Sequence, residues 1–411
     1  EQNITIRKNR ITAASTQIDV KTAKAALFPS LSFSTSQQVV NRPYQETSSR
    51  VSGSEIISSN SKTSYNGNYG LNASWTLYNG NKRLKTIQQE KLNNQVAELD
   101  VATSENNIQE SIAQVYIQIL YAAESVKVNE STLQVSIAQR DRGQELLNAG
   151  SIAKSDFAQL EAQVSTDRYQ LVTAQATLED YKLQLKQLLE LDGENEMNIY
   201  LPALSDENVL APLPTKKDVY IRALSLRPEI EASKLNVEAS ELGIGIAKSS
   251  YLPTISLSAG IGTNHTSGSD FTFGEQVKNG WNNSIGLSVS VPIFNNRQTK
   301  SAVQKAKLQY ETSMLSLLDE QKTLYKTIEG LWLDANSAQQ RYAAANEKLK
   351  STQISYELIS EQFNLGMKNT IELLTEKNNL LQAQQEQLQA KYMAILNMQL
   401  LKFYQGDQLA I

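Results

Sequence analysis

The sequence predicts a mainly α-helical chain that also contributes strands to a membrane β-barrel, built from two copies of one unit. Proline interrupts helix interiors, and none lies between Tyr44 and Leu201 or after Pro292. Two tracts are therefore free to form very long helices. Four segments of about ten residues alternate apolar with small or polar side chains, which is typical of strands with two different faces. Short motifs also recur along the chain in the same order, which indicates an internal duplication.

Composition excludes several classes of protein. The 411 residues are 40% hydrophobic and 20% charged, so the chain is not disordered. A net charge of −4 argues against nucleic acid as the main partner. The absence of cysteine excludes disulfides, thiolate metal sites and a cysteine nucleophile. No run of 18 apolar residues predicts a transmembrane helix, and no signal peptide is visible, as expected if the numbering begins after processing or trimming.

The sequence offers no catalytic constellation. Its single histidine, His265, lies in a polar stretch that is expected to be a loop. No phosphate-binding loop, metal-ligand cluster or Ser/His/Asp arrangement is present. We therefore expect no enzymatic activity, no cofactor and no metal site.

Two pairs of motifs define the duplication. Leu77-Tyr78-Asn79-Gly80 is similar to Ile293-Phe294-Asn295-Asn296, and Asn148-Ala149-Gly150 is similar to Asn364-Leu365-Gly366. Both pairs are 216 residues apart, since 294 − 78 and 364 − 148 give the same number. A constant offset between separate motifs indicates two copies of one structural unit.

The repeats divide the chain into a first unit at 1–191, a connector at 192–217 and a second unit at 218–411. The first unit is predicted to hold a helix, strands at about 29–43 and 64–78, a long helix at 81–148 and a return helix at 151–191. The second is predicted to hold a helix at 218–250, strands at about 252–265 and 281–294, a long helix at 297–364 and a return helix at 369–403. The serine-rich tract 46–64 is predicted to be a loop. Each long helix would extend for about 100 Å at 1.5 Å per residue.

Each long helix is expected to turn back on itself as a coiled-coil hairpin. Gly150 and Gly366 are helix stop signals, because glycine readily takes the left-handed conformation that ends a helix. The return helices carry apolar residues at spacings of three, four and seven, with Gln, Asn, Lys and Glu elsewhere. That pattern predicts two antiparallel coiled-coil hairpins.

The four strands have the length and alternation of membrane strands, apolar toward lipid and polar toward a wet lumen. Four strands alone would leave two open edges, which lipid cannot satisfy. The barrel must therefore be shared between chains, with eight strands from two chains or twelve from three. The strand residues predicted to face lipid are Leu71, Trp75, Leu77, Ile255, Leu257, Ile285, Leu287, Val289 and Val291.

The ordered set of these elements resembles the TolC-like outer-membrane factor (outer membrane efflux protein) family over nearly the whole chain. The residues that carry the resemblance are Leu226-Arg227-Pro228-Glu229-Ile230, Tyr251-Leu252-Pro253, Ile293-Phe294-Asn295, Gly150 and Gly366. The resemblance implies a homotrimer with a twelve-stranded β-barrel continued by an α-helical periplasmic barrel. It implies an exit duct in the bacterial outer membrane, spanning into the periplasm, for a tripartite efflux pump or a type I secretion system. The implied partners are a periplasmic adaptor (membrane fusion) protein, an inner-membrane transporter and outer-membrane lipid.

The resemblance also implies a gate at the periplasmic helical tips. Asp156, Lys368 and Glu372 match charged positions of the family's aperture. Phe363 matches an aromatic position that is often tyrosine, and Thr375 matches one that is acidic in some members. Asp156 and Lys368 could form an ion pair between the hairpins, and three copies of Glu372 could form an acidic ring. Ordinary surface charges are the alternative.

The tips themselves are the expected adaptor-docking sites. The docking residues are Asn148, Gly150 and Ser155 on the first tip and Asn364, Gly366 and Thr370 on the second. A soluble or periplasmic coiled-coil adaptor or scaffold without a pore remains the alternative function. A passive porin or phage receptor is a further one, but it would not explain helices of this length.

Overall fold

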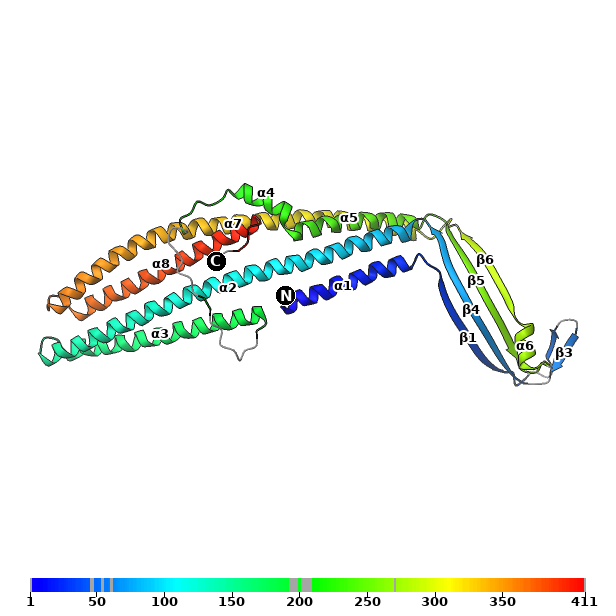
Figure 1. Cartoon of the computed structure of the whole chain (residues 1–411), viewed down its shortest axis with the longest axis horizontal. Helices are drawn as coiled ribbons and strands as arrows, with labels where there is room; N and C mark the ends of the chain where they lie inside the picture. The colour runs from blue at the N-terminus through cyan, green and yellow to red at the C-terminus, as the bar shows by residue number, and fades with distance from the viewer. Residues whose placement is uncertain are drawn as a thin grey trace. The chain divides into compact units, whose positions relative to one another are not determined.

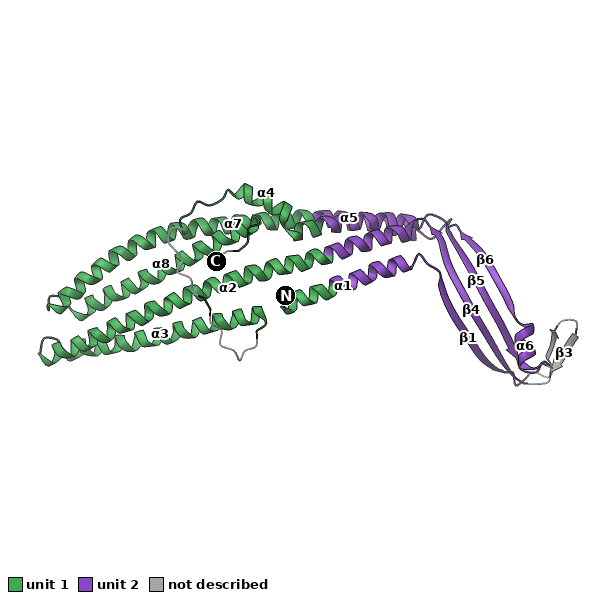
Figure 2. Cartoon of the chain, in the orientation of Figure 1, with its two compact units in different colours: residues 1–12, 97–233, 316–411 green, residues 13–96, 234–315 purple. Residues whose placement is uncertain are grey.

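The structure, a computed structural model, describes residues 2–44, 48–52, 55–59, 62–191, 199–200, 209–269 and 271–409, with the backbone alone given at 48–52 and 55–59. The chain divides into two compact units (Figure 2). Unit 1 comprises residues 1–12, 97–233 and 316–411, and unit 2 comprises residues 13–96 and 234–315. Each unit takes residues from both sequence repeats.

Unit 2 holds a four-stranded antiparallel sheet in the order β1-β4-β5-β6 (Figure 1). The strands are β1 (Ser30–Asn41), β4 (Thr63–Asn79), β5 (Thr254–Thr266) and β6 (Asn282–Ser290). The central pair, β4 with β5, joins the two sequence repeats. The short helix α6 (Phe273–Asn279) lies beside the end of β5, where the Thr263 hydroxyl donates a hydrogen bond of 2.7 Å to the Val277 carbonyl.

The register of the sheet separates apolar from polar side chains. Residues directly opposite each other on neighbouring strands point to the same face. Three rows of one face are Phe33, Leu71 and Ile261; Trp75, Leu257 and Leu287; and Tyr78, Ile255 and Val289. Rows of the other face are Ser30, Ser74, Ser258 and Gly286, and Thr76, Ser256 and Ser288. The strands therefore have the two different faces that their alternation predicted.

Two predicted lipid-facing residues do not have the expected place in a strand. Leu77 lies at a register shift between Thr76 and Tyr78, so it has no partner on β5 and Tyr78 pairs with Ile255 in its place. β6 ends at Ser290, which puts Val291 outside the strand that was predicted to reach residue 294. Pro292 explains the early end, because a residue without an N–H cannot continue a hydrogen-bonded ladder.

The serine-rich tract contains a hairpin where a loop was predicted. β2 (Ser48–Ser52) and β3 (Glu55–Ser59) pair antiparallel as a separate two-stranded sheet. Serine-rich segments carry a weak strand signal, so periodicity alone did not identify this pair.

Two helical hairpins dominate unit 1 (Figure 1). The first is α2 (Lys82–Asn148) with α3 (Lys154–Leu189), and the second is α7 (Gln298–Asn364) with α8 (Thr370–Tyr404). All eight ends of these helices lie within three residues of the predicted bounds. Within the described residues, no helix is both long enough and apolar enough to cross a bilayer.

The helix predicted at 218–250 is two helices, α4 (Lys216–Leu226) and α5 (Pro228–Ser249). Arg227, between them, has φ −74° and ψ 123°. Proline disfavours the helical conformation in the residue before it, which explains the break. Thr215 caps α4 by accepting a hydrogen bond from the Asp218 N–H, so α4 begins within the predicted connector. Most of that connector, 192–198 and 201–208, lies outside the described residues. The remaining helix, α1 (Ile4–Ala25), comes before β1.

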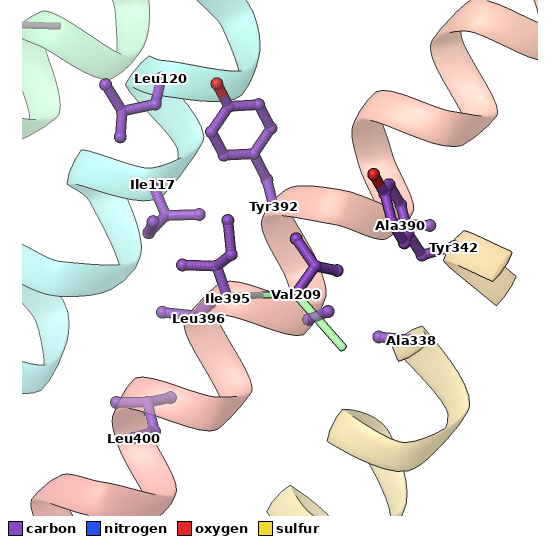
Figure 3. Packing of buried hydrophobic residues seen from close by; sticks show 11 residues of the cluster. Ile117, Leu120, Val209, Ala338, Tyr342, Ala390, Tyr392, Ile395, Leu396 and Leu400 are labelled. Carbon is purple, nitrogen blue, oxygen red and sulfur yellow. The ribbon is translucent and has the colours of Figure 1, made fainter. Parts of the chain in front are cut away.

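The core of unit 1 lies between the hairpins (Figure 3). Ile117 and Leu120 of α2 contact a cluster that includes Tyr342 of α7 and Ile395 of α8. Val209, which precedes α4, is 1% exposed in the same cluster. The segment before α4 therefore helps to bind the two hairpins together.

Candidate functional site

The two hairpin tips have the same backbone construction. Gly150 and Gly366 have φ of +72° and +75°, in the left-handed region that favours glycine. The next residue closes each tip: the Ser151 N–H donates to the Leu146 carbonyl and the Met367 N–H donates to the Gln362 carbonyl, both at 2.8 Å. Apart from the glycine itself and the residues on either side of it, no atom lies within 4 Å of the place that a Cβ would take, so the backbone conformation and not a lack of space explains the glycine.

The acidic residues predicted at the gate cap the return helices in this chain. The Ala153 N–H donates to Asp156 Oδ2 at 3.2 Å, and the Asn369 N–H donates to Glu372 Oε2 at 3.2 Å. Both acids occupy the third position of their helix, where a carboxylate satisfies a free backbone donor and favours the positive end of the helix dipole. The second tip is capped more completely, because Asn369 Oδ1 also accepts a bond of 2.9 Å from the Glu372 N–H.

Lys368 forms its ion pair within the second tip. Its Nζ lies 2.6 Å from Glu372 Oε1, while Asp156 binds its own helix N-terminus. The expected Asp156–Lys368 pair is therefore not made within one chain. Proximity along the backbone explains the difference, because Lys368 and Glu372 are four residues apart at the start of α8.

Side chains predicted at the gate and docking tips have different exposures. Phe363 and Thr370 are 3% and 2% exposed, so neither presents a surface to a partner or a lumen. Thr375 is exposed and its hydroxyl donates to the Ile371 carbonyl. The exposed docking residues are Asn148, Gly150, Ser155, Asn364 and Gly366.

The second tip also exposes apolar side chains that sequence reasoning did not select. Leu365, Met367 and Ile371 are 70%, 71% and 62% exposed. The signal was available in the sequence, since two large apolar residues flank Gly366 in a turn that should be polar. At the positions that correspond to Leu365 and Met367, the first tip has exposed Ala149 and Ser151. The two tips therefore offer chemically different surfaces.

A buried polar cluster lies deeper in unit 1 and connects the hairpins. Lys377 of α8 forms an ion pair with Asp167 of α3, and the hydroxyl of Ser136 on α2 bonds to both. Burial lowers the pKa of Lys377 from its ordinary value of 10.5, with Asp167 opposing that effect. A sequence signal exists, because Lys377 interrupts the buried stripe of Leu373 and Leu380.

The pKa of Glu372 is lowered from 4.5, first by the hydrogen bond from Lys368 and then by the one from the Asn369 N–H. A carboxyl whose pKa is depressed by folding adds stability at higher pH and loses it as pH falls through the folded-state pKa. We therefore expect the second tip to stay capped at neutral pH and to fray as the pH falls below 4.5. Protection factors for amide hydrogen exchange at the start of α8 measure this, with Glu372→Gln as the variant that should show no such step.

The sheet carries a broad apolar surface. On β6, Ile285, Leu287 and Val289 are 83%, 65% and 57% exposed, and Val291 beyond the strand is 57% exposed. Leu71, Trp75 and Leu77 of β4 are also exposed, whereas Ile255 and Leu257 of β5 are half-buried. Exposed large apolar side chains gathered on one face of a sheet indicate a contact with a membrane or a protein.

The described residues hold no group of three or more His, Cys, Asp or Glu that could bind a metal ion. His265, at the end of β5, stacks on Tyr69 with ring centroids 5.9 Å apart and meets Phe273 edge-on at 5.1 Å. Through these ring contacts, α6 packs against the end of the sheet.

Solved structures show which fold this chain has. The chain superposes on the channel CusC with a TM-score of 0.82 over 99% of this chain and 90% of that one, at 19% identity. It superposes on VceC of Vibrio cholerae with a TM-score of 0.78 over 100% and 94%, at 16% identity. These likenesses confirm the predicted fold of duplicated strand and long-hairpin units.

The sequence relatives are named as outer membrane proteins. The chain is 24% identical over 290 residues to outer membrane efflux protein BepC of Brucella suis, and 23% identical over 311 residues to outer membrane protein TolC of Escherichia coli. These matches cover 70% and 74% of this chain, but the chain spans only 60% and 62% of those relatives. The profile of the family described as outer membrane efflux protein matches residues 1–190 and 219–406. The chain therefore belongs to the outer membrane efflux protein family.

Proposed function

We propose that this chain is one of three identical subunits of a channel in the bacterial outer membrane that spans into the periplasm. The channel is a passive exit duct for a tripartite efflux pump or a type I secretion system. The observation that carries the proposal is the four-stranded sheet, which has an exposed apolar face, a polar face and, among the strands that the structure describes, two unpaired edges.

Completion of the sheet by other copies explains its edges. Among the described strands, β1 and β6 are each paired on one side only. A strand edge in lipid leaves backbone donors and acceptors unsatisfied, so a membrane sheet must close. Three copies close a twelve-stranded barrel, with the serine-rich and asparagine-rich face lining a wet lumen and the apolar face in contact with outer-membrane lipid.

Exposed apolar stripes on the helices support assembly with further copies. Ile4, Ile11 and Ile18 of α1 are 51%, 69% and 59% exposed at a spacing of seven residues. Leu308 and Leu315 of α7 repeat the same spacing and are 61% and 66% exposed. A heptad stripe is a coiled-coil seam that buries its side chains only against another helix.

The relatives support the transport role. One sequence relative is the alkaline protease secretion protein AprF of Pseudomonas aeruginosa, and another is the toxin and drug export protein A of Aggregatibacter actinomycetemcomitans. We propose that the exposed tips of this chain dock a periplasmic adaptor, and through it an inner-membrane transporter. The apolar trio Leu365, Met367 and Ile371 gives the second tip the larger share of that contact.

Purification and reconstitution test this function. Extraction with detergent as a trimer, followed by ion conductance in planar bilayers, is the expected result. A folded monomer that dissolves without detergent and conducts no ions would instead support the alternative of a coiled-coil scaffold.

The proposed gate at Glu372 predicts the ion selectivity of the channel. Three copies would form an acidic ring that favours cations at the constriction. Glu372→Gln is expected to reduce the cation preference measured from reversal potentials in a salt gradient. Glu347→Gln, which removes the same charge from an exposed position of α7 away from the tip, is the matched control and should leave the preference unchanged. Equal loss in both variants would contradict a ring at Glu372.

A further inference from the structure

The helix ends that adjoin the sheet carry basic residues and no acidic ones. The four junctions between helix and strand belong to unit 2 (Figure 2) and occupy residues 20–30, 76–88, 245–256 and 290–302. They contain no Asp or Glu, although the whole chain has 43 acidic residues against 39 basic ones. Positive charge therefore gathers at the helix end of the sheet, on Lys21, Lys24, Lys82, Arg83, Lys85, Lys248, Arg297 and Lys300.

Each junction pairs an exposed aromatic side chain with an exposed basic one, three or four residues away along the chain. The pairs are Phe28 with Lys24, Tyr78 with Lys82, Tyr251 with Lys248 and Phe294 with Arg297. The aromatic side chains are 72%, 36%, 52% and 82% exposed in that order. In every pair the aromatic residue is the one nearer to the strand. We call the four basic residues Lys24, Lys82, Lys248 and Arg297 the junction belt.

Helix stability does not explain the charges at the start of α2 and α7. Lys82 is the first residue of α2 and Arg297 comes immediately before α7, and neither helix has an acidic residue in its first turn. The positive end of a helix dipole disfavours a cation at these positions. Arg297 also has φ +64°, close to the +63° of Asn81 at the equivalent position of the first repeat. Asparagine tolerates this left-handed region better than a long side chain does, so Arg297 runs against the backbone preference as well.

Contacts within the chain do not explain the junction belt either. Two other basic residues of the junctions bind backbone carbonyls: Arg83 Nη1 donates to the Ala26 carbonyl at 2.7 Å, and Lys85 Nζ donates to the Gly245 carbonyl at 3.3 Å. Among the described residues, no ion pair or side-chain hydrogen bond joins a belt side chain to another part of the chain. The exposed cations of the belt are therefore available to an anion outside the chain.

We propose that the junction belt binds the phosphate groups of anionic phospholipids in the periplasmic leaflet of the outer membrane. This inference rests on the proposed channel function, in which the apolar face of the sheet contacts lipid. Aromatic side chains prefer the boundary between hydrocarbon and water. Three or four residues span about 14 Å at most, so the cation beyond each aromatic residue reaches the lipid headgroups.

The chemistry of the belt favours a phosphate diester with a net negative charge. Lys and Arg near a membrane surface attract anionic headgroups, and each such residue strengthens the attraction by about fivefold. A zwitterionic headgroup carries an ammonium group that offsets its phosphate, and the junction segments have no carboxylate to receive that ammonium. The belt therefore holds phosphatidylglycerol more tightly than phosphatidylcholine.

Mass spectrometry of the lipids retained by the washed, detergent-solubilised trimer tests the belt, with phosphatidylglycerol and phosphatidylcholine as the probes. The parent trimer is expected to retain phosphatidylglycerol at least about fivefold more than phosphatidylcholine. A variant that combines Lys24→Gln, Lys82→Gln, Lys248→Gln and Arg297→Gln is expected to retain the two lipids equally. Equal retention by the parent, or a parental preference in this variant, would overturn the proposal.

The matched control removes four charges from the same four helices at a greater distance from the sheet. It combines substitutions at exposed lysines, namely Lys8→Gln, Lys91→Gln, Lys234→Gln and Lys307→Gln. Each lies at least nine residues along its helix from the belt residue, which is about 13 Å at 1.5 Å per residue. The control is expected to keep the parental preference. Loss of the preference in the control would show that total charge, and not the belt, determines retention.

The parent trimer alone provides a second test, which does not depend on assembly of the variants. Raising the salt from about 0.1 M to about 1 M shortens the Debye length from about 10 Å to about 3 Å, and the preference for phosphatidylglycerol is expected to disappear. Inorganic phosphate at matched ionic strength is expected to displace no more lipid than sodium chloride does. A preference that survives high salt would contradict recognition by charge, and displacement by inorganic phosphate would show a site for a free anion instead.

The two levels of inference fail differently. A chain that forms no trimer in detergent and conducts no ions would contradict the channel function itself. A conducting trimer without the expected lipid preference would contradict the junction belt and leave the channel function in place.

Discussion

Val289→Arg is expected to impair assembly of the channel in the outer membrane. Val289 lies opposite Ile255, which lies opposite Tyr78, so its side chain is on the apolar face of the sheet. A charge on the lipid face of a membrane strand costs about 2–4 kcal/mol at the bilayer midplane and about 0–1 kcal/mol near the interfaces, and Val289 lies one residue from the end of β6. A trimer meets that cost three times. Heat-resistant trimers in outer-membrane fractions, detected by electrophoresis without boiling, provide the measurement.

Ser288→Arg is the matched control, because it puts the same charge on the adjacent residue of β6. Ser288 lies opposite Ser256 and Thr76, on the polar face. A side chain there points into the proposed wet lumen, where a charge remains hydrated. We expect trimers in parental amount and a changed conductance. Assembly of the Val289 variant together with failure of the Ser288 variant would mean that the two faces are exchanged.

Arg227→Ala is expected to destabilise unit 1 by about 3–5 kcal/mol, because it removes the cationic partner of a carboxylate in a largely buried site. The Arg227 side chain is 5% exposed, and its Nη2 lies 2.8 Å from Glu110 Oε1. Its guanidinium also lies 3.6 Å from the centre of the Tyr404 ring. The substitution removes the bond between α2 and the α4–α5 break and exposes the ring at the end of α8. Denaturant unfolding of the detergent-solubilised protein, followed by circular dichroism, measures the loss.

Arg222→Ala is the matched control, because it removes an arginine from α4, the helix that ends just before Arg227. Arg222 is exposed on α4, and an exposed substitution of this kind is usually within about 0.5 kcal/mol of neutral. Tyr404, which contacts Arg227, shows that this site is largely closed to water. Its burial, followed by the nearby charge of Glu110, raises the pKa of Tyr404 to about 12. Equal stability losses for the two variants would contradict a special role for the buried guanidinium.

Features with a local cause were predictable from the sequence. The long helices end at Asn148 and Asn364, as predicted, because the following Gly150 and Gly366 supply the positive φ that a helix end requires. The alternation of β5 and β6 correctly divided apolar from polar side chains, because the strand period of two is a property of the backbone.

Features that depend on several segments were not predictable in the same way. The bulge at Leu77 arises where β4 meets β5, and its position depends on both strands. Lys368 has Glu372 within reach on its own segment, so its partner could not be inferred from charge signs alone. The break at Arg227 followed from Pro228, but its burial against Glu110 and Tyr404 required the fold.

The sequence by itself determined the duplicated order of elements, the lengths of the four hairpin helices, the two faces of the sheet and the glycine tips. Each of these follows from helix and strand periodicity or from the conformational limits of glycine and proline, which act over a few residues. Only the tertiary structure decided that β4 pairs with β5 across the two repeats. It also brought Ser136, Asp167 and Lys377 together in one buried cluster. Contacts between residues hundreds of positions apart depend on how helices pack and on which charges lose their water, and no local pattern records that.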